Sequence, residues 1–271
     1  MAHAELFSRL GDERLQAQEL LEHAAGRPLE DDDEIDAATQ RTFDRLLQRR
    51  TSGEPVAYIR GYEEFRGMRL TVRPGAFIPH QSTEFLAEQA IRRLRGRRDP
   101  VAADLAAGVG AAGLGIARAL PRARVYGTDI SPVAVELARA NARKNRVTNI
   151  RFLTGSMFEP LPKRLRGAID VIVSHPPYIA AHEVPDLAKE LVAFEPIGSL
   201  TDSSNDGLGL FRVVVAGSRI WLKPSGWLCV EIASDLARPA RAALSRAGYR
   251  EVRSTHGPSL ATRVVVARRP I

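Results

Sequence analysis

Apolar residues follow two different spacings along the chain, and the change falls after about residue 65. Before it, apolar residues recur at intervals of three and four, which is typical of amphipathic helices. Three such segments lie at 4–10, 13–26 and 32–53, and Gly26 and Gly53 stand where helices commonly end. We therefore expect a small N-terminal helical domain over residues 1–65, followed by a linker over 66–83 that contains short strands.

From residue 84 to residue 271, short apolar runs alternate with helix-like segments. The runs predict strands at 100–106, 123–130, 149–155, 168–174 and 226–233. The helix-like segments lie at 111–120, 132–145, 207–222 and 235–248, the last with an expected break at Pro239. This alternation indicates an α/β domain with a doubly wound parallel sheet. Two final strands, at 249–255 and 262–269, have no helix between them and should pair antiparallel at one edge.

The composition is that of a globular protein, with 44% hydrophobic and 26% charged residues among 271. Cys229 is the one cysteine, so no disulfide framework is possible and a reducing compartment is the default expectation. The N-terminus lacks the pattern of a secretory signal, and no apolar run approaches about 18 residues. We therefore expect a cytoplasmic protein without a membrane span. The net charge of +7 favours anionic partners, or it reflects arginines spread over the whole surface.

A glycine-containing turn joins the first strand of the second domain to its helix, in the sequence DLAAGVGAAGLGIA from Asp104 to Ala117. Gly108 and Gly110 allow a sharp turn and a close approach of the backbone to a ligand. Asp129 ends the next strand, nineteen residues after Gly110, where a carboxylate can bind both hydroxyls of a ribose. The pattern predicts a nucleoside site.

The position of Asp104 discriminates between nucleosides. A dinucleotide site prefers G-x-G-x-x-G and places a pyrophosphate at the helix start, where an acid at the strand end would repel it. S-adenosylmethionine carries an ammonium group, a sulfonium and a ribose, and these suit Asp104, the glycine turn and Asp129 better. The alternative for Asp104 is purely structural, with its side chain capping the turn.

The sequence AIDVIVSHPPYIAAHEVPDL runs from an apolar strand straight into His175, Pro176, Pro177 and Tyr178. Two prolines end the strand and stiffen the turn, so the histidine and the tyrosine are held rigidly at its end. Neutral histidine offers one acceptor and one donor nitrogen, and it also serves as a general base. His175 therefore either takes part in the chemistry or simply caps the turn. No cluster of cysteines and histidines has metal-ligand spacing, so we predict no metal.

Four stretches of the chain resemble the protein-(glutamine-N5) methyltransferases that modify bacterial peptide chain release factors. These are RRTSGEPVAYIRGYEEFRGMRLTV, AFIPHQSTEFLAEQA, VIVSHPPYI and FEPIGSLTDSSNDGLGLFRVVVAGSRIWLKPSGWLCVEIA. The resemblance covers nearly the whole chain, including its helical N-terminal part. It implies a class I S-adenosylmethionine-dependent methyltransferase fold, with a seven-stranded doubly wound sheet whose last strand is reversed. It also implies that the N-terminal domain docks a protein substrate.

Where these enzymes carry Asn-Pro-Pro-Tyr, this chain has His175, Pro176, Pro177 and Tyr178. In the family the asparagine and a proline carbonyl hold the target amide, and the tyrosine packs on the plane of that amide. The resemblance thus assigns His175, Pro176 and Tyr178 to catalysis, and the whole turn to substrate binding. Together with the glycine turn it gives the following cofactor-binding set: Phe77, Ile78, Pro79, Asp104, Ala106, Gly108, Gly110, Asp129, Met157 and His175.

The chain departs from the family pattern at several of these positions, while scaffold features such as Gly53-Glu54-Pro55 remain. The departures are Ala106 for the first loop glycine, His80, Gln81 and Ser82 for Arg, Pro and Asp, Ser156 for the acid near the adenine, and His175 for the asparagine. This distribution indicates a working scaffold with an altered site.

The leading hypothesis is methylation of a glutamine side-chain amide in a release factor, with S-adenosylmethionine as methyl donor. One alternative is a paralogue that N- or O-methylates a small metabolite or peptide, with His175 as base. Another is a nucleic-acid methyltransferase, because Pro-Pro-Tyr turns also serve the exocyclic amines of flipped bases; nucleic acid is the less favoured direct substrate. A non-catalytic binding module, suggested by Ala106, is the last alternative.

Overall fold

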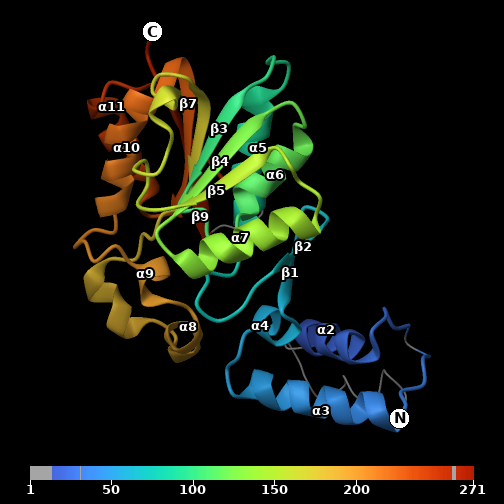
Figure 1. The fold of residues 1–271 in the computed structure, drawn as a ribbon. Helices are drawn as coiled ribbons and strands as arrows, with labels where there is room; N and C mark the ends of the chain where they lie inside the picture. The colour runs from blue at the N-terminus through green and yellow to red at the C-terminus, as the bar shows by residue number, and fades with distance from the viewer. Residues whose placement is uncertain (1–13, 31, 258–260) are drawn as a thin grey trace.

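A computed structural model describes residues 14–30, 32–257 and 261–271. Its N-terminal lobe is helical, with α2 (Arg14–Ala25), α3 (Ala37–Thr51) and the short α4 (Val56–Arg60) lying apart from the sheet (Figure 1). Leu20, Leu21 and Phe43 are buried between these helices, which agrees with the three- and four-residue spacing in the sequence. Asp36 caps α3 by accepting from two backbone N–H groups of its first turn. The helix predicted at 4–10 lies outside the described residues.

A two-stranded hairpin connects this lobe to the larger domain. It consists of β1 (Tyr62–Phe65) and β2 (Met68–Thr71), which pair antiparallel. The next element, α5 (Gln81–Leu94), begins three residues before the domain boundary expected at residue 84. The domain limits at 65 and 84 stay predictions.

The larger domain contains a seven-stranded sheet in the order β5-β4-β3-β6-β7-β9-β8. Its strands are β3 (Val101–Leu105), β4 (Arg124–Asp129), β5 (Ile150–Thr154), β6 (Ile169–Ser174), β7 (Leu222–Ala233), β8 (Arg250–Thr255) and β9 (Thr262–Arg268). The strands from β5 to β7 pair in parallel, whereas β9 pairs antiparallel with both β7 and β8. The expected doubly wound sheet with a reversed last strand is therefore confirmed.

Helices cover both faces of the sheet, and alternate residues of each strand point to opposite layers. The helices α5, α6 (Ala111–Ala119) and α7 (Pro132–Lys144) pack with Ala102, Val171 and Val173 on one face. The helices α10 (Gly209–Trp221) and α11 (Ala237–Arg246) pack with Ala103 and Ile172 on the other. Burial on both faces explains why the central strands read as continuous apolar runs.

The break expected at Pro239 is wrong, because α11 is continuous from Ala237 to Arg246. Pro239 lies in its first turn, where backbone N–H groups have no partner within the helix. A proline there removes no hydrogen bond, so the helix accommodates it.

The segment between β6 and α10 folds into short helices that the apolar pattern does not predict. They are the 3-10 turn Ala181–Asp186, α8 (Lys189–Phe194) and α9 (Ile197–Leu200); another 3-10 turn, Lys163–Leu165, precedes β6. Figure 1 shows α8 and α9 at the end of the sheet that also faces the N-terminal lobe. In the described residues, no helix has the length and apolar character needed to cross a membrane.

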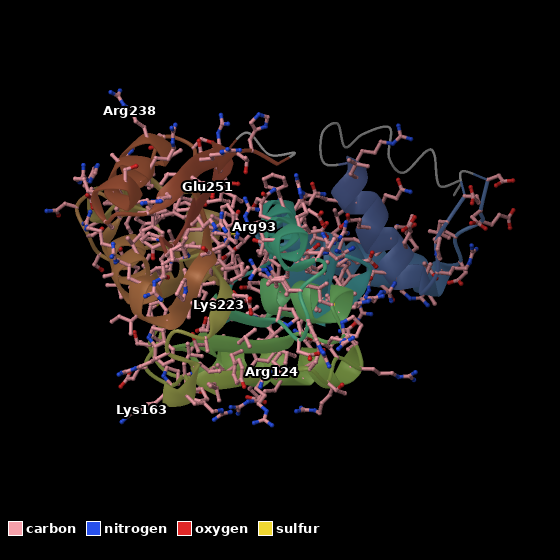
Figure 2. The ribbon with its side chains drawn as sticks, turned by 90° about the horizontal axis from the view of Figure 1, so that it is seen from above. Arg93, Arg124, Lys163, Lys223, Arg238 and Glu251 are labelled. Carbon is pink, nitrogen blue, oxygen red and sulfur yellow. The ribbon has the colours of Figure 1, made fainter. Side chains whose placement is uncertain are left out.

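The positive charge is distributed around the molecule. Arg124, Lys163 and Arg238 are exposed, and Figure 2 shows Arg238 on the side of the larger domain away from Lys163 and Arg124. These three cations form no single patch. They favour the interpretation of the +7 charge as arginines and lysines spread over the surface.

A buried asparagine ties the connecting hairpin to the larger domain. The Asn141 side chain, on α7, accepts from the backbone N–H of Thr71 at 2.7 Å and donates to the Thr71 carbonyl at 3.1 Å. It also donates to the carbonyl of Val109, in the glycine turn, at 3.1 Å. One side chain thus fixes β2, α7 and the glycine turn relative to one another.

We expect Asn141→Ala to lower the free energy of unfolding by about 3 kcal/mol, because three backbone groups lose their partner in a buried place. Urea denaturation of the full chain measures this change. Asn205→Ala, the same change at an exposed asparagine outside the helices and strands, is the matched control and should cost less than about 1 kcal/mol. An equal loss of unfolding free energy in both variants would contradict the role of Asn141 in joining β2, α7 and the glycine turn.

Candidate active site

A cavity of about 410 Å³ lies where the carboxyl ends of β3, β4, β5 and β6 meet. Its wall contains Ala106, Asp129 and His175, which end or directly follow β3, β4 and β6, and Met157, three residues after β5. Parallel strands place such ends at one edge, and the edge where neighbouring crossovers diverge is the usual ligand site of doubly wound sheets. The fold therefore brings together residues that are up to about 70 positions apart in the sequence.

Two carboxylates stand on the cavity wall. Asp104 is buried and accepts a hydrogen bond at 2.7 Å from the N–H of Gly113, in the first turn of α6. Its burial raises its pKa to about 7. Asp129 accepts from the N–H groups of Gly108 and Ser131, both at 2.8 Å, and desolvation raises its pKa as well. Asp104 thus does cap a turn, and it lines the cavity too.

The residues of the glycine turn have different roles. Ala106 and Gly108 line the cavity with φ angles of 55° and 54°, in the left-handed region. Ala106 therefore holds a conformation that glycine would adopt without steric cost. Gly110 does not line the cavity; it precedes α6 with a φ of 90°, and a Cβ there would lie 2.5 Å from the ring of Phe152. This position needs glycine because a larger residue would collide with Phe152.

The rest of the predicted cofactor set lies mostly in the same cavity. Phe77, Pro79 and Met157 line it, and Met157 is anchored by its carbonyl, which accepts from the Thr128 hydroxyl at 2.7 Å. Ile78 does not line it but is buried among residues such as Tyr58.

The His175-Pro176-Pro177-Tyr178 turn lines the same cavity and lies beside the glycine turn, because β6 pairs directly with β3. The His175 and Tyr178 rings stack at 5.5 Å with an interplanar angle of 27°. Phe77 meets the His175 ring edge-on at 5.5 Å. Desolvation raises the pKa of Tyr178 to about 12, so its phenol stays neutral near pH 7. The stacked pair presents a flat, rigid surface to the cavity.

A buried carboxylate lies behind the histidine. Glu231, on β7, is 0% exposed, and its Oε2 accepts from the Thr83 hydroxyl at 3.1 Å. The same Oε2 lies 3.7 Å from His175 Nδ1, and Thr83 Oγ1 lies 3.4 Å from it. We did not predict a role for Glu231; the signal in the sequence is an acid inside the apolar run WLCVEIA, on a strand that the fold buries on both faces.

The segment with α8 and α9 closes the third side. Leu191, Pro196 and Leu200 line the cavity. Glu195 is buried beside them with Oε2 unpaired within the described residues, and desolvation raises its pKa to about 7. Sequence patterns alone did not point to this apolar wall. Within the described residues, no group of three or more His, Cys, Asp or Glu side chains is placed to hold a metal ion.

Comparison with known proteins identifies the family. A family model described as PrmC N-terminal domain matches residues 2–61, and one described as Methyltransferase domain matches residues 99–232. The release factor glutamine methyltransferase of Bordetella pertussis is 39% identical over 92% of this chain and 93% of its own length. That of Burkholderia pseudomallei is 38% identical over 93% and 90%, respectively. The chain belongs to the release factor glutamine methyltransferase family.

Solved structures agree on the fold. A methyltransferase from Pyrococcus furiosus has a TM-score of 0.57 at 16% identity, covering 84% of this chain and all of its own. The T. thermophilus 16S rRNA N2 G1207 methyltransferase, solved with AdoMet and guanosine, has a TM-score of 0.56 at 19% identity, covering 77% and 49%. The predicted family, the class I fold and the assignment as a methyltransferase enzyme are therefore confirmed.

We expect Gly110→Ala to destabilise the enzyme by about 3 kcal/mol, because the methyl group meets Phe152 and the backbone is left-handed. Gly26→Ala, at a φ of 70° with no atom within 4 Å of the new methyl, is the control and should cost about 1 kcal/mol. Urea denaturation compares the two. A loss at Gly110 no larger than that at Gly26 would mean that the helix start adjusts freely.

Proposed function

We propose that this enzyme transfers a methyl group from S-adenosylmethionine to the side-chain amide of a glutamine in a peptide chain release factor. The observation that carries the proposal is that one cavity is lined by the glycine turn with Asp104 and Asp129 and also by the His175-Pro176-Pro177-Tyr178 turn. The first matches the charges of the methyl donor, and the second matches the shape of a planar amide. The names of the relatives supply the substrate class.

The residues present fit S-adenosylmethionine. Each carboxylate oxygen of Asp129 accepts one backbone N–H and keeps a lone pair for a ribose hydroxyl. Asp104 leaves one oxygen for an ammonium group, and a cation there would favour its ionised form over the protonated one. When bound, the cofactor supplies a methyl group on a positively charged sulfur. The apolar side chain of Met157 adds a surface for a base.

The acceptor wall suits an amide for a physical reason. An amide nitrogen is a poor nucleophile because its lone pair is delocalised into the carbonyl. Acceptors at its N–H groups, offered by His175 and the Pro176 carbonyl, would orient it, and Tyr178 would pack on its plane. Orientation in a cavity that excludes water then supplies much of the rate enhancement.

The N-terminal lobe supports a protein substrate. A second cavity of about 510 Å³ is lined by residues of α2, α4, β1 and α5, and it shares Pro79 and His80 with the first. A loop inserted along it would reach the acceptor wall. We propose residues 1–65 as the docking domain, and the cytoplasm, where peptide chains are released, as the place of action. Because glutamates such as Glu63 and Glu84 line this second cavity, the overall positive charge does not by itself describe the docking surface.

We expect Asp129→Ala to weaken binding of S-adenosylmethionine about 10- to 100-fold, since a charge-assisted pair of hydrogen bonds to the ribose is lost. Isothermal titration calorimetry on the full chain measures it. Asp44→Ala, at an exposed carboxylate on α3, is the control and should bind as the wild type does. Unchanged affinity in Asp129→Ala would refute the ribose assignment.

The methyl acceptor is tested by transfer of labelled methyl from S-adenosylmethionine to a purified release factor. We expect one methyl group per protein on a glutamine side chain, located by peptide mass spectrometry, and none when that glutamine is replaced by alanine. Label that appears only on small peptides, metabolites or RNA from a cell extract would support the alternative acceptors instead.

A further inference from the structure

The surroundings of His175 Nδ1 determine which ring nitrogen carries the proton. Among the described residues, its polar neighbours are Thr83 Oγ1 at 3.4 Å and Glu231 Oε2 at 3.7 Å. A hydroxyl has one hydrogen, and that of Thr83 is directed to Glu231 at 3.1 Å. An ionised carboxylate has only acceptor atoms. Nδ1 therefore faces two acceptors and is the group that donates.

Nε2 is left as an acceptor, because a neutral imidazole carries one N–H. Within the described residues Nε2 makes no hydrogen bond, and the ring lines the cavity between Phe77 and Tyr178. An unprotonated Nε2 offers the kind of lone pair that an asparagine oxygen offers at this place in the family. Compared with the asparagine of the family, His175 thus keeps a hydrogen-bond acceptor at this place and adds a nitrogen that can take up a proton.

We infer that Thr83 and Glu231 are positioning residues that hold His175 in the Nδ1–H form, so that Nε2 accepts an N–H of the methyl acceptor and takes its proton during transfer. The inference rests on the proposed function for the identity of that acceptor. The amide nitrogen forms a bond to the methyl carbon as the bond between that carbon and sulfur breaks. The nitrogen gives one proton to Nε2 of His175. The positive charge thereby passes from the sulfur to the imidazole ring. The proton returns to solvent as the product leaves.

The buried carboxylate suits this role. Glu231 is 0% exposed and its Oε1 has no partner within the described residues, so it is an incompletely paired acceptor in the core. A carboxylate in such a place is costly, and an imidazolium beside it would offset part of that cost. Thr83 connects the two groups and fixes the plane of the ring.

The other titratable groups that face His175 stay neutral near pH 7. They come from the start of α5, where desolvation and the charge of His175 lower the pKa of His80, and from the turn itself, where the pKa of Tyr178 is about 12. Asp104 and Asp129 line the same cavity on the cofactor side. Glu231, whose Oε2 lies 3.7 Å from Nδ1, is the carboxyl group next to the ring.

The tautomer is measured directly by long-range proton–nitrogen correlation spectra of the full chain labelled with ¹⁵N at histidine. The His175 signals are those that vanish in His175→Asn. We expect Nδ1 to carry the proton and Nε2 to resonate as an unprotonated nitrogen. In Thr83→Val the preference should fall, and in Thr83→Ser it should return. A protonated Nε2 in the neutral wild-type ring would overturn the inference.

Kinetics separate positioning from mere support of the fold. In Thr83→Val we expect kcat to fall about 10- to 100-fold with the KM for S-adenosylmethionine unchanged, and Thr83→Ser to recover most of the rate. The matched control is Thr255→Val, the same change at a half-buried threonine on β8 that donates to the Val264 carbonyl, and it should keep the wild-type rate. Loss of rate in Thr83→Val with an unchanged tautomer would contradict the positioning role.

The pH profile tests the proton transfer. With S-adenosylmethionine saturating, so that protonation of Asp104 does not limit its binding, the wild-type kcat should fall as the pH is lowered, because a proton on Nε2 removes its lone pair, and His175→Asn should lack this decline. The same acidic decline in both enzymes would overturn the proton-acceptor role. The spectra need no substrate: if they show the Nδ1–H form while release factors are not methylated, the proposed function fails and the positioning by Thr83 and Glu231 stands.

Discussion

The parallel pairing of β3 with β4 on one side and β6 on the other is the constraint on which this molecule depends. The register places Leu105 beside Thr128 and also beside Ser174, so the residues that follow these three positions meet at one edge of the sheet. Ala106, Asp129 and His175 are those residues. The residues proposed to bind the cofactor and the turn proposed to bind the methyl acceptor are therefore neighbours because of backbone hydrogen bonding, before any side chain contributes.

Buried polar groups then make that edge specific. Asn141 holds the hairpin and the glycine turn together through three backbone hydrogen bonds, and Asp104 and Asp129 each accept backbone N–H groups near the same turn. Buried polar groups are tolerated when they are paired, so these contacts both stabilise the turn and fix its shape. Within the part of the chain that the structure describes, Glu231 Oε1 has no such partner, although Oε2 of the same carboxyl group accepts from Thr83.

Gly108 and Gly110, the two glycines of the turn, are needed for different reasons. Gly108 sits where an added Cβ would find open space, and its N–H binds Asp129, so it shapes the ligand-facing backbone. Gly110 is confined by Phe152 and belongs to the packing of α6 on the sheet. Ala106 has a left-handed backbone although it carries a Cβ atom. Such a conformation persists where the surrounding structure, here β3 before it and α6 after it, holds the backbone in place.

The sequence alone determined the strands, their parallel arrangement with a reversed last strand, and the candidate residues at the strand ends, because periodicity and glycine placement are local signals. It also contained the family resemblance, and with it the replacement of asparagine by His175. It did not determine what lies behind His175 or beside Leu200, since those contacts join α5, β7 and the α8–α9 segment across long stretches of chain. The continuity of α11 through Pro239 was likewise decided by where its first turn begins. Only the tertiary structure could place Thr83 and Glu231 against His175, because a buried carboxylate acquires its partners when the sheet and its covering helices pack together.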